Sequence, residues 1–480
     1  MIKQKSVGVN AGLNMIKTVC QVIFPLITFP YVSRVLHVEN IGIYNFCQSV
    51  VSYFSLAAGL GISTYAVREG ARYRNDREEM SKFASEIFSI NMISTLISYL
   101  VLVVCILYIP ELNQYAKITV ALSVSILFTT IGCEWIFQIY EEFGYITIRS
   151  IAFQCLSLIF LFVFVKDSSD LLVYATITAV SSSGANIINA ISRRKYCKIR
   201  IIINKKIFKH LMPILVLFAT SVATTIYTNA DITMLGVFAG NKATGLYSVS
   251  TKIYNIVKQM LAALIIVSIP RLSSYLGLKK IKAFESMANQ ILNALIVIVV
   301  PSVIGIFSLS KNIVLFISGQ EYIEAEMSLK ILSIALFFSI FSWFYTSCVL
   351  IPYRMENKVL IATIIAALAN IGLNFILVPC FQQDAAAATT VIAEALSLFI
   401  TWWYGRKYFK MVLCRKDISS VIIGCIGIWF ICTSIERRIY SVWISTVFSI
   451  VISVFYYLIL LLVMNNQSLK LIVGMLRNSK

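Results

Sequence analysis

The stretch "LISYLVLVVCILYI", Leu96–Ile109, is apolar on every side, unlike the surface helix of a soluble protein, which keeps one polar face. A transmembrane β-strand would alternate apolar and polar residues over roughly ten positions, and this run does not alternate. Similar runs recur along the 480 residues, of which 59% are hydrophobic and only 13% charged. A soluble domain of that composition would expose large apolar patches to water. The sequence therefore predicts an all-α polytopic membrane protein.

Basic residues give the expected orientation of this protein. Windows of roughly 20 apolar residues place about fourteen transmembrane helices. Thirty of the 41 Lys and Arg residues then fall on one side of the membrane and seven on the other. The positive-inside rule makes the richer side cytoplasmic, so we expect both termini there. The net charge of +19 is then mostly topological, and its expected partners are anionic phospholipids, not nucleic acid.

The sequence lacks the patterns of metal sites and enzymes. The eleven cysteines show no CxxC spacing, and the two histidines lie near the ends of expected helices, so we expect no disulfide framework, metal site or cofactor. No GxxxxGK[ST] phosphate loop is present, and no long loop carries a nucleophile with its base. We therefore expect a protein that is not an enzyme.

An internal repeat organises the chain. A shift of 203 residues brings "GIYNFCQSVVS" (Gly42–Ser52) onto "GLYSVSTKIYN" (Gly245–Asn255). Six expected helices separate the copies, so both enter the membrane in the same direction and form a parallel repeat. The alternative is two ordinary hairpins that share a Gly-x-Tyr turn by chance.

The repeat predicts three regions. Residues 1–200 form an N-terminal lobe of six helices, and residues 201–410 form a C-terminal lobe of six more. Residues 411–480 add a helix pair and a cytoplasmic tail. The boundary between the lobes falls in the most basic loop, Ser192–His210.

Polar side chains follow one face of the first two helices of each lobe. Asn45 and Gln48 lie on such a face near the first copy of the repeat, and Lys252 and Asn255 lie on the equivalent face of the second. Single polar residues in such helices more often bond to their own backbone or pack between helices. Four equivalent helices with aligned polar faces favour a hydrated cavity between them.

Asp231 lies in the otherwise apolar stretch "YTNADITMLGVF", Tyr227–Phe238. A charge near the centre of a bilayer is costly and usually has a partner or a function. Asp231 and Lys252 lie eight residues before and after the same turn, so we expect them at equal depth. Two interpretations stay open: a salt bridge that fixes the hairpin, or a carboxylate that senses a cation or contacts substrate.

Three other charged residues lie in or beside the expected helices, and two of them have two interpretations. Glu394, in "AAAATTVIAEALSLF" (Ala385–Phe399), has no partner nearby in the sequence and is either an ion-coupling residue or a packed, protonated acid. Glu134, beside Trp135, is expected to anchor the chain at the membrane interface. Arg34 is either an outer-leaflet anchor or an anion contact.

Two parts of the chain resemble a known family. "PLITFPYVSRVLHVENIGIYNFCQSVVSYFSLAAGLGISTYAVREGARYRN" (Pro25–Asn75) and "SKFASEIFSIN" (Ser81–Asn91) closely resemble the opening of bacterial oligosaccharide flippases. "NADITMLGVFAGNKATGLYSVSTKIYNIV" (Asn229–Val257) is similar to the family's second lobe. These flippases belong to the multidrug, oligosaccharidyl-lipid and polysaccharide exporter superfamily.

The resemblance implies a two-lobe transporter of fourteen helices that works by alternating access in the bacterial inner membrane. Its substrate would be an undecaprenyl-pyrophosphate-linked oligosaccharide, such as an O-antigen unit, moved from the cytoplasmic to the periplasmic leaflet with an ion gradient. A polysaccharide polymerase and a chain-length regulator would be its partners. The expected substrate-binding residues are Lys17, Gln21, Arg34, Asn45, Gln48, Lys252, Asn255 and Lys258, and the expected ion-coupling residues are Asp231 and Glu394.

Two rival functions differ from this expectation in their sequence signs. A drug or cation antiporter of the same superfamily should favour buried acids, whereas the polar faces here hold three lysines and one aspartate. A membrane polymerase or glycosyltransferase should carry a large outer loop that holds its site. The longest outer loop expected here, around "KNIVLFISGQEYIEA" (Lys311–Ala325), has only 15 residues, which counts against such an enzyme.

Overall fold

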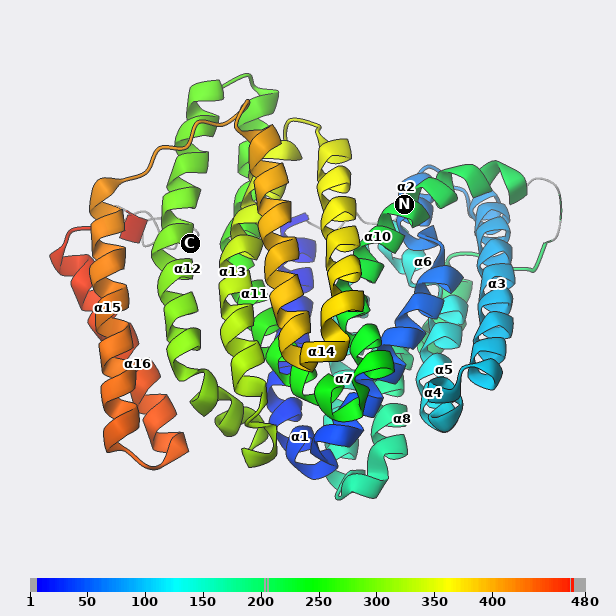
Figure 1. Cartoon of the computed structure of the whole chain (residues 1–480). Coiled ribbons are helices and arrows are strands. Elements are labelled where there is room, and N and C mark those ends of the chain that lie inside the picture. The colour runs from blue at the N-terminus through cyan, green and yellow to red at the C-terminus, as the bar shows by residue number, and fades with distance from the viewer. Residues whose placement is uncertain (1–6, 203, 205–206, 467, 470–480) are drawn as a thin grey trace. The chain divides into compact units, whose positions relative to one another are not determined.

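The computed structural model describes residues 7–202, 204, 207–466 and 468–469, and these residues are almost entirely helical with no β-strand among them (Figure 1). The all-α class predicted from the sequence is thus confirmed. The chain forms two compact units, Met1–Gly245 and Leu246–Lys480. The lobes expected at 1–200, 201–410 and 411–480 stay a prediction, because packing density and membrane topology divide a chain by different criteria.

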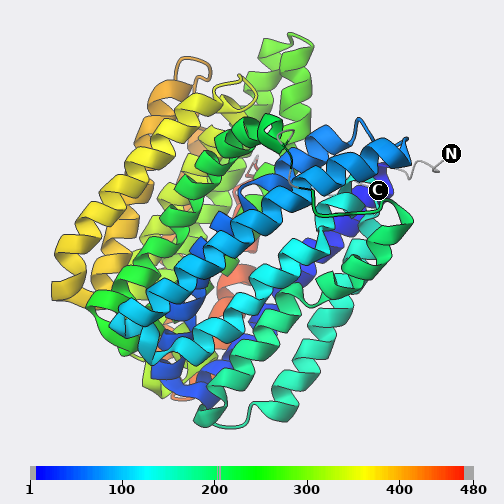
Figure 2. The same cartoon turned by 90° about the vertical axis from the view of Figure 1, so that its right-hand side faces the viewer.

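Unit 1 contains the N-terminal helices. Its helices run alongside one another in Figure 2. In chain order they are α1 (Val7–Gly59), α2 (Ile62–Gly70), α3 (Arg77–Tyr108), α4 (Pro110–Gln114), α5 (Ala116–Gly132), α6 (Glu134–Ile139), α7 (Phe143–Phe164), η1 (Ser168–Asp170), α8 (Leu171–Ser183), α9 (Ala185–Ser192), η2 (Arg193–Lys195) and α10 (Phe208–Phe238).

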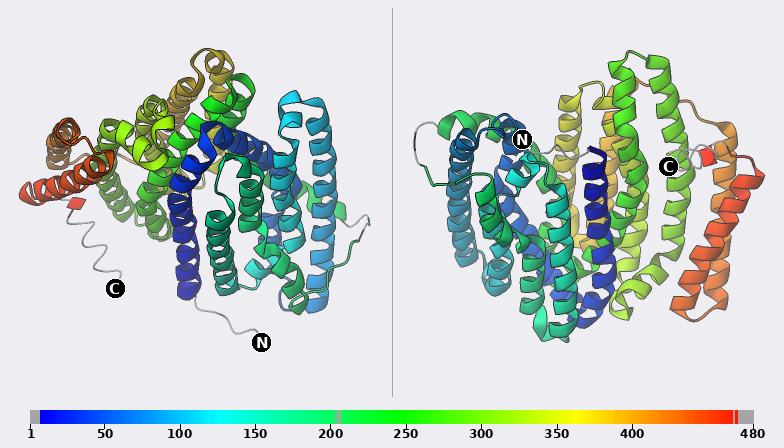
Figure 3. Two further views of the ribbon diagram at one scale, coloured as in Figure 1. Left: turned by 90° about the horizontal axis from the view of Figure 1, so that it is seen from below. Right: turned by 180° about the vertical axis from the view of Figure 1, so that it is seen from behind.

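Unit 2 follows, and α11 begins at the end of unit 1. The hairpin of α15 and α16 packs against α12, as the orange and red helices of Figure 3 show. The elements are α11 (Gly240–Gly277), α12 (Ile281–Ser318), η4 (Gln320–Tyr322), α13 (Ala325–Phe344), η5 (Tyr345–Leu350), α14 (Glu356–Gly405), α15 (Arg415–Arg438) and α16 (Val442–Val463).

The two longest helices are each broken once. His37 interrupts α1 with φ 64° and ψ 169°, and Gln382 interrupts α14 with φ 50° and ψ −128°. A positive φ is costly for a residue with a side chain and ends the regular helix there. Eleven helices of the described residues are long and apolar enough to cross a membrane, and Ala116–Gly132 is a shorter apolar helix. Counting the halves of α1 and α14 separately gives the fourteen expected segments.

Two glycines let the copies of the repeat touch. A Cβ added at Gly42 would lie 1.9 Å from the carbonyl oxygen of Asn241, and one added at Gly245 would lie 2.1 Å from that of Val38. Both positions therefore need a residue without a side chain. Gly42 and Gly245 are 203 residues apart, and so are Val38 and Asn241. This reciprocal contact between equivalent residues supports the repeat inferred from the sequence.

In unit 1 an extended segment, which we call the first strap (residues 198–202), lies along α3. Three of its backbone N–H groups donate to serine hydroxyls spaced four residues apart on the helix. Four helical residues rise by about 6 Å and two extended residues by about 6.6 Å, so the two spacings nearly match. The bonds run from Lys198 to Ser81 at 3.0 Å, from Arg200 to Ser85 at 3.0 Å, and from Ile202 to Ser89 at 2.8 Å.

Unit 2 holds an equivalent segment, the second strap (residues 410–414), on α12. Here the helix supplies Asn289 and Asn293, and each amide both donates to the strap and accepts from it. Asn289 bonds to the carbonyl of Lys410 at 3.1 Å and to the N–H of Val412 at 2.7 Å. Asn293 bonds to the carbonyl of Val412 at 2.9 Å and to the N–H of Cys414 at 3.1 Å. Ser85 and Ser89 lie 204 residues before these asparagines, one residue from the period of the repeat.

Candidate functional site

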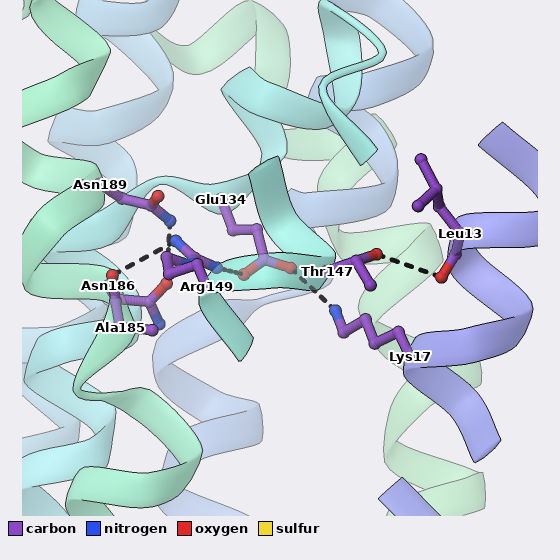
Figure 4. A network of polar contacts seen from close by, with 8 residues as sticks. All are labelled: Leu13, Lys17, Glu134, Thr147, Arg149, Ala185, Asn186 and Asn189. Atoms are coloured by element: carbon purple, nitrogen blue, oxygen red, sulfur yellow. Dashed lines mark hydrogen bonds and ion pairs between the residues drawn. The ribbon is translucent and has the colours of Figure 1, made fainter. Parts of the chain in front are cut away.

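A network of three charged side chains joins α1, α6 and α7 of unit 1 (Figure 4). Lys17 Nζ lies 3.5 Å from Glu134 Oε1, and the guanidinium of Arg149 donates to Glu134 Oε2. The exposed fraction of the side chain is 5% for Arg149, 21% for Lys17 and 27% for Glu134. Arg149 is therefore the buried member of the network, and Lys17 is the more accessible cation.

Local structure positions the carboxylate and the arginine of this network. Glu134 is the first residue of α6, because Cys133 takes a left-handed conformation with φ 45° and separates α5 from α6. Arg149 lies in the second turn of α7, and its Nη1 also donates to the carbonyl oxygen of Ala185 at 3.3 Å. Figure 4 shows Asn186 and Asn189, which share a hydrogen bond of 3.1 Å, beside this arginine.

A further hydrogen bond ties the first helix to α7. The Thr147 hydroxyl donates to the carbonyl oxygen of Leu13 at 3.1 Å, one turn of α1 before Lys17. Lys17 therefore meets Glu134 from a helix that is already held against α7. The hydrogen bond between Thr147 and Leu13 and the ion pair between Lys17 and Glu134 can therefore be removed by separate substitutions.

The charge balance of this network favours an anion. Two cations surround one carboxylate, and an arginine stays protonated at any pH that a cell tolerates. The guanidinium binds Glu134 closely, so the carboxylate keeps a partner even if Lys17 moves away. Lys17 can therefore contact a negatively charged ligand without leaving a carboxylate uncompensated.

Unit 2 holds a second charged network, between α11 and α14. Lys258 Nζ lies 2.9 Å from Glu394 Oε1 and donates to the hydroxyl oxygen of Tyr254 at 3.3 Å. The Tyr254 hydroxyl donates to the same carboxylate oxygen at 3.2 Å. The Glu394 side chain is 8% exposed and that of Lys258 23%. This network holds one cation and one carboxylate, so its charges balance.

The other residues expected at the site lie on three helices. Asn45, on α1, donates to the carbonyl of Ile41 in its own helix at 2.8 Å, and Gln48 is half-buried one turn later. Arg34 is exposed and donates to the carbonyl oxygen of Pro30 at 3.5 Å. The side chain of Gln21 lies outside the described residues.

Asp231 and Lys252 fall in different units. Asp231 is buried on α10 in unit 1, whereas Lys252 is half-buried and Asn255 exposed on α11 in unit 2. The pairing expected from their equal distance to the turn therefore stays a prediction. So does the role of every residue expected at the site.

Sequence reasoning missed Arg149 and Tyr254. Arg149 was one of the thirty Lys and Arg residues assigned to the cytoplasmic side, although Ile148 and Ile151 lie close to it in the sequence and could have signalled a buried arginine. Glu134 belongs to a charged network, in addition to its place beside Trp135. Glu394, for which the sequence suggested no nearby partner, pairs with a lysine 136 residues away. Within the described residues, no three His, Cys, Asp or Glu side chains gather as a metal site would require.

Comparisons with known proteins give the family of this chain and several of its relatives. Residues 7–276 match the family described as "Polysaccharide biosynthesis protein". The chain is 25% identical over 397 residues to a "Putative O-antigen transporter" of Escherichia coli (strain K12), covering 82% of this chain and 94% of that one. It is 24% identical over 408 residues to "Capsular polysaccharide biosynthesis protein CapF" of Staphylococcus aureus, covering 82% and 97%.

Two solved structures share the fold. "Lipid II flippase MurJ, inward closed conformation" superimposes with a TM-score of 0.74 at 18% identity, covering 93% of this chain and 97% of that one. A "multidrug resistance MATE family transporter of the MOP superfamily", in its inward-facing conformation, gives a TM-score of 0.59 at 14% identity, covering 82% and 97%. These likenesses confirm the transporter-like fold of membrane helices expected from the sequence. Because the family match extends over more than half of its length, the chain belongs to the polysaccharide biosynthesis protein family.

Proposed function

We propose that this protein is a flippase that moves a lipid-linked polysaccharide precursor across the membrane. The excess of cations around Glu134 is the observation that carries the proposal, because a phosphate-containing headgroup needs compensating positive charge inside a membrane protein. Its family membership, its relatives named as O-antigen or capsular polysaccharide proteins, and its flippase-like fold support the same function.

The substrate we propose is an undecaprenyl-pyrophosphate-linked oligosaccharide. Lys17 is partly exposed and its contact with Glu134 is long, at 3.5 Å, so it can exchange the carboxylate for a pyrophosphate oxygen. Arg149 keeps Glu134 compensated during that exchange. Transport would run from the cytoplasmic to the periplasmic leaflet of the inner membrane, with both chain termini in the cytoplasm.

We place ion coupling in unit 2, at Glu394. The Glu394 carboxylate is nearly buried and paired with one lysine, so a coupling cation can bind it only in exchange for that lysine. Cation binding and movement of Lys258 would therefore be linked, as coupling to a gradient requires. Asp231 is the second candidate, either as a partner of Lys252 or as an ion ligand.

A drug or cation antiporter is the alternative within the superfamily, and the MATE-like fold alone does not separate the two. The charge of the first network supports the flippase, because a site for organic cations needs an excess of carboxylates. The polymerase and chain-length regulator that would use the product are proposed partners.

The test is a transport assay in a strain that lacks this gene. Expression of the protein should restore surface polysaccharide, and inverted vesicles should move a radiolabelled lipid-linked oligosaccharide to the lumenal leaflet. Efflux of ethidium from the same cells should stay at the level of the empty vector. Ethidium export without movement of the oligosaccharide lipid would replace the proposal with an antiporter.

A further inference from the structure

The two halves of α14 enclose an apolar groove in unit 2. It has a volume of about 220 Å³ and is lined by Ile361, Ile365, Phe399, Ile400, Trp403 and Tyr404. Phe399 and Trp403 are about half exposed, with exposed fractions of 55% and 44%. The groove is therefore open at the molecular surface. Its lining residues come from both halves of α14, which lie side by side in Figure 1.

Two cations lie at the rim of this groove, each on an aromatic face. Arg406 Cζ is 3.3 Å from the centroid of the Trp403 ring, and Lys358 Nζ is 4.9 Å from that of Tyr404. Stacking holds a guanidinium by its flat face, while its N–H donors point outward in the plane. The described residues give neither cation an ion pair. Both therefore keep donors for an external acceptor.

The surrounding chain reinforces the positive charge. Arg354 precedes α14, and Lys407 and Lys410 follow it, so five basic residues lie in sequence around the two ends that form the rim. Glu356 is the one acidic residue in these two stretches, 354–358 and 406–410. By the positive-inside rule this rim faces the cytoplasm, where the leaflet is rich in anionic lipids.

We propose that this groove binds an anionic phospholipid of the cytoplasmic leaflet. One acyl chain lies between the two halves of α14, and the phosphate accepts hydrogen bonds from Arg406 and Lys358. A chain can enter from the bilayer because the apolar lining is open to the surface. Charge selects the headgroup, and the groove positions the chain beside it. This site is separate from both charged networks and goes beyond the proposed transport activity.

Native mass spectrometry of the purified full-length protein tests the site. The protein should retain phosphatidylglycerol in preference to phosphatidylcholine. Arg406→Gln and Lys358→Gln should each lower the bound phosphatidylglycerol by at least roughly tenfold, the effect of losing a charge-assisted hydrogen bond to the phosphate. Lys407→Gln is the matched control, because Lys407 follows Arg406 directly but has no ring contact among the described residues. Its loss of bound lipid should stay within roughly fivefold, the effect of one basic residue near an anionic surface.

Three further arms separate the outcomes. Arg406→Lys keeps the charge and should keep more lipid than Arg406→Gln, which guards against a variant that folds poorly. Ile365→Trp fills the groove and should weaken binding of long-chain phosphatidylglycerol but not of its dihexanoyl form. Equal retention of the two headgroups, or an equal loss in Lys407→Gln, would overturn the proposal. Tighter retention of undecaprenyl phosphate than of phosphatidylglycerol would assign the groove to a polyprenyl chain instead.

Discussion

The Glu134 network of unit 1 and the Glu394 network of unit 2 differ in their balance of charge. In unit 1, Lys17 and Arg149 surround Glu134, so one positive charge is left over. In unit 2, Lys258 and Glu394 form a single pair with a tyrosine hydroxyl on the same oxygen. A surplus cation can bind an anionic ligand, whereas a balanced pair has no spare charge. The comparison therefore supports our proposal that the substrate's phosphate binds in unit 1 and that Glu394 of unit 2 takes part in ion coupling.

The networks should also respond differently to the loss of a carboxylate. An arginine cannot lose its proton inside the protein, whereas a lysine can. Arg149 is almost fully buried, while Lys258 keeps about a quarter of its side chain exposed. The first network should therefore depend more strongly on its acid than the second.

The largest effect is expected for Glu134→Gln, which leaves two cations without a carboxylate. Its free energy of unfolding should fall by ~3–5 kcal/mol, the usual cost of stranding a buried charge. Glu394→Gln should cost less, because the partly exposed side chain of Lys258 can reach water. Chemical denaturation in micelles measures both variants.

The control for Glu134→Gln is Glu141→Gln, in the same unit. Glu141 pairs with Arg74 at 2.9 Å, but both side chains are about a third exposed, so the loss should stay below about 1 kcal/mol. Adding Arg149→Met to Glu134→Gln should restore part of the stability, since the stranded charge is then gone. If Glu134→Gln and Glu141→Gln lower the free energy of unfolding by the same amount, the charges of the first network do not stabilise the protein.

Lys258→Gln should have the next largest effect. It leaves Glu394 buried with only the Tyr254 hydroxyl, at a cost of ~2 kcal/mol. Adding Glu394→Gln removes the carboxylate that the first change leaves without a cation, so the double variant should recover part of that loss. Chemical denaturation in micelles measures both variants, with Lys330→Gln as the control for loss of a lysine. A double variant no more stable than Lys258→Gln would show that Glu394 does not depend on its lysine.

Much of the fold could be predicted from the sequence, whereas the site could not. Apolar runs and basic loops are local signals, and they gave the helical class and fourteen segments. The repeat was visible because Gly42 and Gly245 must both lack a side chain where equivalent segments touch. The pairing of Lys258 with Glu394 joins residues 136 positions apart, which no local pattern reports.

Glu134 and Arg149 are only 15 residues apart, yet their pairing was also missed. A hydropathy window treats a charged residue near a short loop as exposed to solvent. Arg149 was therefore assigned to the membrane surface. The buried position of Arg149 depends on how α6 and α7 fold back on each other, and that is tertiary information. The roles of the substrate-binding and ion-coupling residues stay predictions for the same reason.

The two straps also differ between the units, in the number of hydrogen bonds that each helix side chain makes to its strap. Asn293 makes two hydrogen bonds to the second strap, whereas Ser89 makes one to the first. At about 1 kcal/mol for each bond, Asn293→Ala should cost ~2 kcal/mol and Ser89→Ala ~1 kcal/mol. Hydrogen exchange of the two segments should show faster opening of residues 410–414 in the first variant and of residues 198–202 in the second. Equal costs would mean that the serine and asparagine straps contribute alike.

The smallest effect on stability, and the sharpest on function, is expected for Lys17→Gln. Arg149 still compensates Glu134 in this variant, and the lost contact is long and partly exposed, so the free energy of unfolding should change by less than about 1 kcal/mol. Transport of the oligosaccharide lipid should fall at least roughly tenfold, as expected for loss of a charge-assisted phosphate contact, and Lys17→Arg should retain more activity.

Thr147→Val removes the neutral contact between α7 and the carbonyl of Leu13, so it tests whether Lys17 acts only by holding α1 in place. If Thr147→Val lowers transport as much as Lys17→Gln does, then position matters and charge does not, and the surplus cation of unit 1 has no part in binding the substrate. If only Lys17→Gln loses activity while its fold is kept, the difference between the two networks is functional: one spare positive charge in unit 1 separates a site for anions from the balanced pair in unit 2.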